Sequence, residues 1–120
     1  MGCNKEPSDL TGTTWKVESI VENGTNTLPI ELKNRGMQIS FGFNGVCYGG
    51  ATANAFKGVW KQSGKLSEIT ISARILTEAL EHPMGHVFMD HINNTYKGSI
   101  NRGKLRLYYA KTNYVQFKPL

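Results

Sequence analysis

The amino-acid sequence predicts a mainly β protein, a small antiparallel barrel or sandwich with one α-helix inserted before its last three strands. Three observations lead to this prediction. A chain of 120 residues, with 39% apolar and 19% charged residues, has the size and composition of one folded domain. Short segments with apolar residues at every second position alternate with turn signals at nearly regular spacing. Helical spacing occurs in one segment, and no apolar run approaches the roughly 18 residues of a membrane span.

The N-terminal strands show the alternation most clearly. The buried face of residues 13–21 is predicted to carry Trp15, Val17 and Val21. The opposite face carries Lys16, Glu18 and Ile20. Residues 37–43 place four large side chains on one buried face, namely Met37, Ile39, Phe41 and Phe43. The Asn44-Gly45 pair is typical of a type I′ hairpin turn and predicts a returning strand at 46–48.

The later strands follow the same rule. In residues 56–62 the inward positions are Phe56, Gly58 and Trp60. Ser63-Gly64 predicts a turn, and Ile69 and Ile71 mark the next strand. Residues 96–101, 104–110 and 113–118 form a predicted meander near the C-terminus. Its inward side chains are predicted to be Tyr96, Leu105, Leu107, Tyr109, Val115 and Phe117.

The one predicted helix begins at Pro83, because proline at the first helical position loses no needed hydrogen-bond donor. Its apolar stripe consists of Met84, Val87, Phe88, His91 and Ile92. Asn93-Asn94 predicts its end. His82 is expected to leave the helical region because a proline follows it.

Residues 1–9 are expected to form a flexible tether before a folded domain at 10–120. The segment is polar, contains Pro7 and shows no apolar periodicity. Cys3, followed by a short polar stretch, lies where a bacterial lipoprotein carries its lipid after removal of the signal peptide. Cys3 is therefore the predicted lipid attachment site. This expectation requires the printed chain to begin at the mature end of a longer precursor, because an apolar signal segment does not precede Cys3 here.

Several groups that could carry chemistry are more simply explained by structure. His82, His86 and Asp90 are spaced like metal ligands on one helical face, but without a third histidine or cysteine nearby we expect a solvated face and no metal. Cys47 is predicted to be a small buried filler and His91 a packed histidine. The predicted surface carboxylates are Glu78, Glu81 and Asp90. The glycines at 42, 45, 49 and 50 are expected to serve the backbone. We therefore expect no catalytic residue and no cofactor.

The net charge of +5 raises the question of an anionic partner. Basic residues alternate with aromatic ones along the predicted strands, at Lys57, Lys61, Lys65, Lys97, Arg102, Lys104 and Arg106. A nucleic-acid-binding barrel needs aromatic and basic side chains on one exposed face. Here most rings are predicted to point inward, and only Tyr108 joins the outward basic row. We therefore expect no nucleic-acid binding, and an anionic membrane surface is the easier partner.

Motifs along residues 10–119 resemble one family. The chain opens with Leu10-Thr11-Gly12-Thr13-Thr14-Trp15, continues through Asn44-Gly45-Val46-Cys47-Tyr48-Gly49-Gly50 and Phe56-Lys57-Gly58-Val59-Trp60, and reaches Lys104-Leu105-Arg106-Leu107 after a helix that contains Phe88. In this order the motifs resemble the META domain, the family of the heat-inducible bacterial protein HslJ. The second cysteine that often precedes the family's helix is absent between residues 75 and 82, which argues against a disulfide from Cys47.

The resemblance implies a small lipocalin-like β-barrel exported to the bacterial envelope, as a periplasmic or outer-membrane lipoprotein, and it transfers no catalytic residue. The leading hypothesis is a non-enzymatic, monomeric, lipid-anchored domain that interacts with envelope protein or cell-wall partners. Gly12 and Trp15 also match the G-x-W opening of lipocalins, so the alternative is a barrel that binds a small apolar ligand. Its candidate ligand-binding residues are Trp15, Phe41, Phe43 and Trp60. This alternative ranks second, because large inward side chains would fill an eight-strand interior.

Overall fold

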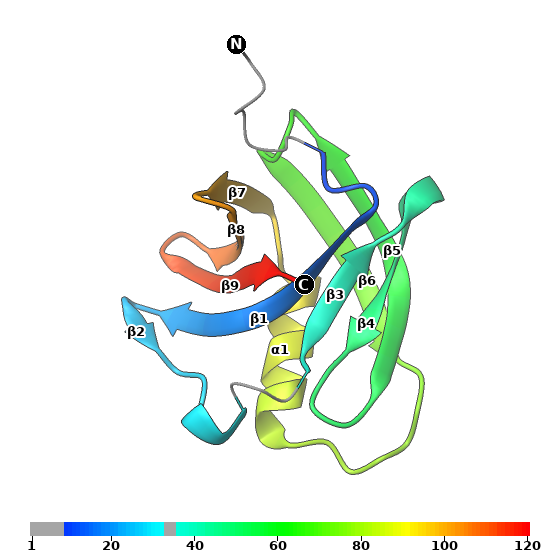
Figure 1. Ribbon diagram of the computed structural model, residues 1–120, viewed down its shortest axis with the longest axis vertical. Helices are drawn as coiled ribbons and strands as arrows, with labels where there is room; N and C mark the ends of the chain where they lie inside the picture. Colours follow the sequence, from blue (N-terminus) through cyan, green and yellow to red (C-terminus); the bar gives the residue numbers. More distant parts are fainter. Residues whose placement is uncertain (1–8, 33–35) are drawn as a thin grey trace.

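A computed structural model describes residues 9–32 and 36–120 of the chain, and the predicted lipid attachment site Cys3 lies outside these residues. The described residues contain one antiparallel sheet that curls around a single core (Figure 1). Its strands are β1 (Thr13–Glu22), β2 (Thr25–Asn26), β3 (Gln38–Phe41), β4 (Val46–Gly50), β5 (Ala55–Ser63), β6 (Glu68–Ile75), β7 (Lys97–Asn101), β8 (Lys104–Ala110) and β9 (Asn113–Pro119). The helical elements are the 3₁₀ turns η1 (Ile30–Leu32) and η2 (Phe43–Gly45) and the α-helix α1 (Pro83–Asn93).

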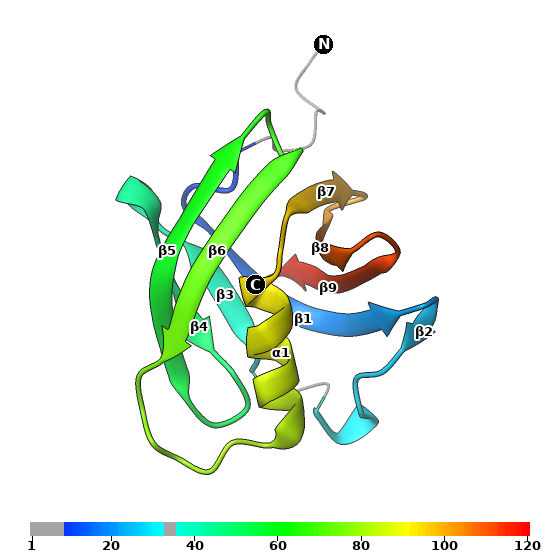
Figure 2. The same cartoon turned by 180° about the vertical axis from the view of Figure 1, so that it is seen from behind.

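The sheet has the strand order β6-β5-β4-β3-β1-β9-β8-β7, with β2 paired to β1 outside this path. Its two edges meet at one end, where Ile69 N donates to Tyr96 O at 3.1 Å and Gly98 N donates to Leu66 O at 2.8 Å. Helix α1 packs against β6 and β8 and lies beside the gap between the edges (Figure 2). The result is a half-barrel completed by a helix, so the predicted mainly β, lipocalin-like fold with a helix before its last three strands is confirmed.

The core is built from the inner faces of the strands and from one face of α1. Phe88 of α1 contacts rings on the inner face of two separate strands, with centroid distances of 6.1 Å to Phe56 of β5 and 6.4 Å to Phe117 of β9. The largest fully buried side chains are Phe41, Phe56, Phe88, Phe117, Leu10, Ile20, Leu32, Met37, Ile39, Ile69, Ile92 and Leu105. Burial of these apolar side chains is the main force that closes the sheet around the helix.

The predicted turn at Asn44-Gly45 is confirmed. Asn44 and Gly45 both have positive φ, 61° and 74°, as a type I′ turn requires. Arg102 and Gly103 adopt the same combination, 55° and 78°, between β7 and β8. Within residues 9–32 and 36–120, no helix combines the length and hydrophobicity that a membrane span requires.

A β-bulge in β1 reverses part of the predicted alternation. The pairing of β1 with β9 shifts between Val17 and Ser19. One extra residue at a bulge moves the following side chains to the opposite face. Ile20 is therefore fully buried and Val21 only half-buried, so the prediction that Val21 points inward and Ile20 outward is wrong.

Helix α1 begins and ends as predicted, but it is rotated relative to the predicted stripe. His82 is the N-cap, and its Nδ1 accepts a hydrogen bond from Met84 N at 3.0 Å. The buried positions are Gly85, Phe88, Met89 and Ile92, whereas Met84, Val87 and His91 are half-buried. Gly85 lies against the Glu81 carboxylate, which leaves no room for a Cβ atom there. The segment before the helix thus covers a side of it that periodicity alone did not identify.

Candidate functional site

Three of the four predicted ligand-binding residues lie inside the barrel. Trp15, Phe41 and Trp60 are buried on the inner faces of β1, β3 and β5. Phe43 is 72% exposed, so its predicted inward position is wrong. The reason is local, because β3 ends at Phe41 and Phe43 already belongs to the hairpin turn, where strand alternation no longer applies.

The buried rings form part of the core packing. Phe41 and Trp60 meet edge to face, with ring centroids 5.0 Å apart. Trp60 Nε1 donates to Gly42 O at 3.1 Å, and Trp15 Nε1 donates to Thr13 Oγ1 at 2.7 Å. A ligand inside the barrel would have to displace these side chains and their hydrogen bonds. The apolar-ligand hypothesis stays a prediction.

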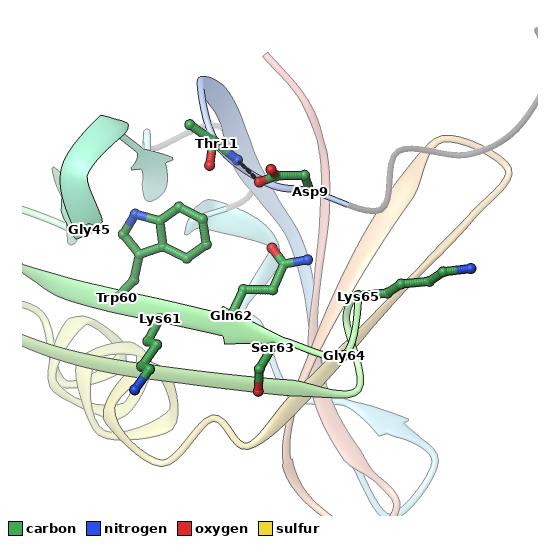
Figure 3. A pocket seen from close by; sticks show the side chains of 9 residues that line it. All are labelled: Asp9, Thr11, Gly45, Trp60, Lys61, Gln62, Ser63, Gly64 and Lys65. Carbon is green, nitrogen blue, oxygen red and sulfur yellow. Dashed lines mark hydrogen bonds between the residues drawn. The ribbon is translucent and has the colours of Figure 1, made fainter.

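A groove of about 510 Å³ lies at the end of the barrel near Asp9 (Figure 3). Gln62 Oε1 accepts from Leu10 N at 3.1 Å, and Asp9 Oδ1 accepts from Thr11 N at 2.9 Å. The hydrogen bonds from Thr11 lower the pKa of the Asp9 carboxyl. Figure 3 shows the side chains of Lys61 and Lys65 pointing away from Trp60. The polar groups of this groove thus stabilise the start of the fold and do not converge on one point.

The segments before α1 contain a buried carboxylate that the sequence did not reveal. Glu81 is only 7% exposed, so its prediction as a surface residue is wrong. Its Oε2 accepts from Thr52 N at 2.7 Å and Ala53 N at 3.0 Å. Its Oε1 accepts from Asn54 N at 3.1 Å and Asn54 Nδ2 at 2.9 Å. A carboxylate with four donors satisfies the backbone of the β4–β5 loop, which is a structural role.

The candidate metal ligands His82, His86 and Asp90 lie at or on α1, and the candidate nucleophile Cys47 lies on β4. His82 caps α1, while His86 and Asp90 are exposed on it. Among residues 9–32 and 36–120, no group of three histidine, cysteine, aspartate or glutamate side chains is placed to share a metal ion. Cys47 is fully buried, as predicted, and burial raises the pKa of its thiol to about 11. A thiol with this pKa is a poor nucleophile at neutral pH.

Aromatic and basic side chains gather on the outer face of β7, β8 and β9. Lys97 Nζ lies 4.9 Å from the Tyr108 ring and 5.8 Å from the Tyr96 ring, and Arg106 Cζ lies 4.3 Å from the Tyr114 ring. Tyr96 is 43% exposed, so the prediction that it points inward is wrong. It precedes β7, at the point where the sheet edges meet, and is outside the regular alternation. The prediction that Tyr108 alone joins the basic row is also incomplete, because Tyr114 lies opposite it.

Comparison with known proteins shows the fold and no family. No family model matches the chain, and no curated protein matches it. A solved DUF4847 family protein from Bacteroides vulgatus is similar with a TM-score of 0.70 and 19% identity, over 91% of this chain and 93% of that one. A protein from Burkholderia xenovorans gives a TM-score of 0.74 at 11% identity, over 92% and 83% of the two chains. A third structure gives 0.64 at 20% identity, over 95% and 94%. These similarities extend over nearly the whole chain and establish the half-barrel fold.

Proposed function

We propose that the chain is a non-enzymatic META-like (HslJ-like) domain of the bacterial cell envelope, a periplasmic or outer-membrane lipoprotein anchored through Cys3. It acts as a monomer through contacts between its outer surface and envelope protein or cell-wall partners. The observation that carries this proposal is the solid interior, in which Phe41, Phe56, Phe88 and Phe117 are at most 1% exposed. A domain filled in this way interacts through its outside.

The buried polar side chains of the described residues also support a non-enzymatic domain. Each buried side-chain nitrogen or oxygen in them has a hydrogen-bond partner within the protein. A buried polar group without a partner would have marked a candidate catalytic position in these residues. The order of motifs that resembles the META family, together with Cys3 near the N-terminus, supports the envelope location.

Fatty-acid labelling tests the anchor. The open reading frame that encodes this chain would be expressed in a bacterium fed a radiolabelled fatty acid, in its natural form and as Cys3→Ala. We expect label in the natural protein, no label in Cys3→Ala, and sedimentation of the natural protein with the envelope. The matched control is Cys47→Ala, which should keep the label because Cys47 is buried. An unlabelled natural protein in the cytoplasmic fraction would overturn the proposal.

A further inference from the structure

Strands β1, β9, β8 and β7 are neighbours in the sheet and lie on one side of the barrel (Figure 1). Their outer face, called here the basic face, carries several lysine and arginine side chains. On β8 and β9 the inner face carries Leu105, Leu107, Val115 and Phe117. The alternate residues therefore point outward. The basic face consists of Lys16, Glu18, Lys97, Lys104, Arg106, Tyr108, Tyr114, Gln116 and Lys118.

Strand register holds two of these cations against aromatic rings. Lys97, Tyr108 and Tyr114 are directly opposite one another across β7, β8 and β9. Lys97 Nζ lies 4.9 Å from the Tyr108 ring, and Arg106 Cζ lies 4.3 Å from the Tyr114 ring. Arg106 Nε also donates to Gln116 Oε1 at 2.9 Å. Both cations are thus ordered before any partner binds, which lowers the entropic cost of binding.

The fold leaves most of this charge uncompensated. Glu18 pairs with Lys104, its Oε1 lying 2.7 Å from Nζ, and this is the one ion pair in the part of the chain that the structure describes. Lys97 and Arg106 therefore form no ion pair with a carboxylate in that part. Lys16 and Lys118 lie directly opposite each other on β1 and β9, where like charges repel. The Glu18 carboxylate attracts Lys118 as well as Lys104 and offsets part of this repulsion. An anion from outside the chain that contacts these cations would offset their mutual repulsion.

From this juxtaposition we propose that the basic face binds a linear phosphate polymer without nucleobases, recognised through its anionic groups. Phosphate matches the guanidinium of Arg106, whose terminal N–H groups present paired donors. Bases are not the favoured ligand, since Lys97 and Arg106 cover ring faces on which they would stack. A bilayer is not favoured either, because the outside of a curled sheet is convex and a flexible chain follows it better than a flat surface. This inference rests on the proposed function in one respect, which is the location of the partner in the envelope.

The test measures binding of the purified chain to inorganic polyphosphate, by fluorescence anisotropy at several salt concentrations. With about four cations engaged, the logarithm of the association constant should fall with the logarithm of salt concentration with a slope of about −3. Lys97→Gln/Arg106→Gln should weaken binding at least about tenfold at low salt and make the slope shallower by about 1.4. Because the assay uses purified protein, it is independent of lipid labelling at Cys3.

The matched control is Lys57→Gln/Arg74→Gln, which removes the same charge from a cross-strand pair on β5 and β6. It should weaken binding less than about threefold. A second variant, Lys16→Gln/Lys118→Gln, relieves repulsion and should weaken binding without lowering the melting temperature. The proposal would be overturned if Lys97→Gln/Arg106→Gln and Lys57→Gln/Arg74→Gln weakened polyphosphate binding equally. Preferential binding, at equal charge, of single-stranded DNA or of phosphatidylglycerol vesicles would also overturn it.

Discussion

Asn54 binds the Glu81 carboxylate twice, because its backbone N and its side-chain Nδ2 both donate to Oε1, at 3.1 Å and 2.9 Å. Asn54 Oδ1 in turn accepts from Thr77 Oγ1 at 2.6 Å and from Ala79 N at 2.8 Å. These bonds join the β4–β5 loop to the segment between β6 and α1. The pair therefore fixes where the helix enters the open side of the sheet.

Glu81→Gln should destabilise the fold by about 1–3 kcal/mol, since the new amide group would face two donors and leave them without an acceptor. The free energy of unfolding would be measured by urea denaturation. Glu78→Gln is the matched control, because Glu78 is exposed on the same segment and should change stability by less than about 0.5 kcal/mol. Equal effects of the two substitutions would show that Glu81 is not buried in solution.

Phe41→Ala and Phe43→Ala should differ sharply although the two residues are neighbours on one predicted face. Phe41 is fully buried, so its truncation should cost about 3–5 kcal/mol through lost burial and a residual cavity. Phe43 is 72% exposed, so its truncation should cost less than about 1 kcal/mol. Thermal and urea denaturation of the two variants would check this. A large loss in Phe43→Ala would mean that its ring is buried in solution.

Cys47 should resist alkylation in the folded protein. Burial raises the pKa of its thiol to about 11, so very little reactive thiolate exists at neutral pH, and the side chain is fully buried. The experiment would use Cys3→Ser, in which Cys47 is the remaining cysteine of the two in the sequence. Iodoacetamide should label this variant rapidly in urea and at least about a hundredfold more slowly without it. Rapid labelling of the folded form would contradict the buried position.

The direction of side chains could be predicted from the sequence in regular strands, but not where a strand is irregular. The predicted inward positions Phe56 and Trp60 on β5 and Leu105 on β8 are confirmed, because these strands alternate without interruption up to those residues. The predictions for Val21 and Phe43 failed where a bulge and a turn change the alternation. A bulge depends on pairing with a distant strand, which a period-two pattern does not encode.

The site residues show a related limit. Glu81 accepts a hydrogen bond from the backbone N of Thr52, which lies 29 positions away in the sequence. A backbone donor carries no side-chain signature, so nothing at Thr52 indicates a buried carboxylate partner. The cations over Tyr108 and Tyr114 likewise depend on the register of β7, β8 and β9. The alternating pattern predicts that Arg106 and Tyr108 point outward. The side chains that they contact depend on the register of the neighbouring strands.

His91 should make stability depend on pH. Its ring stacks on Tyr109 with centroids 3.5 Å apart and an interplanar angle of 2°. Burial lowers the pKa of His91 below the ordinary 6.5 and outweighs the nearby Asp90 and Glu22, which raise it. The unfolded chain therefore takes up a proton on His91 at a higher pH than the folded chain. The contribution to stability is complete above pH 6.5 and is lost as pH falls through the folded pKa.

His91→Phe isolates this effect, because it keeps a flat ring against Tyr109 and removes the titrating group. The free energy of unfolding would be measured by urea denaturation at a series of pH values for both proteins. The wild-type value should fall relative to His91→Phe as pH decreases below 6.5, and the difference should be constant above it. His91→Gln should lose the same pH dependence while being less stable at every pH, because it also loses the stack. Parallel pH profiles for the wild type and His91→Phe would show that the fold does not shift the His91 pKa.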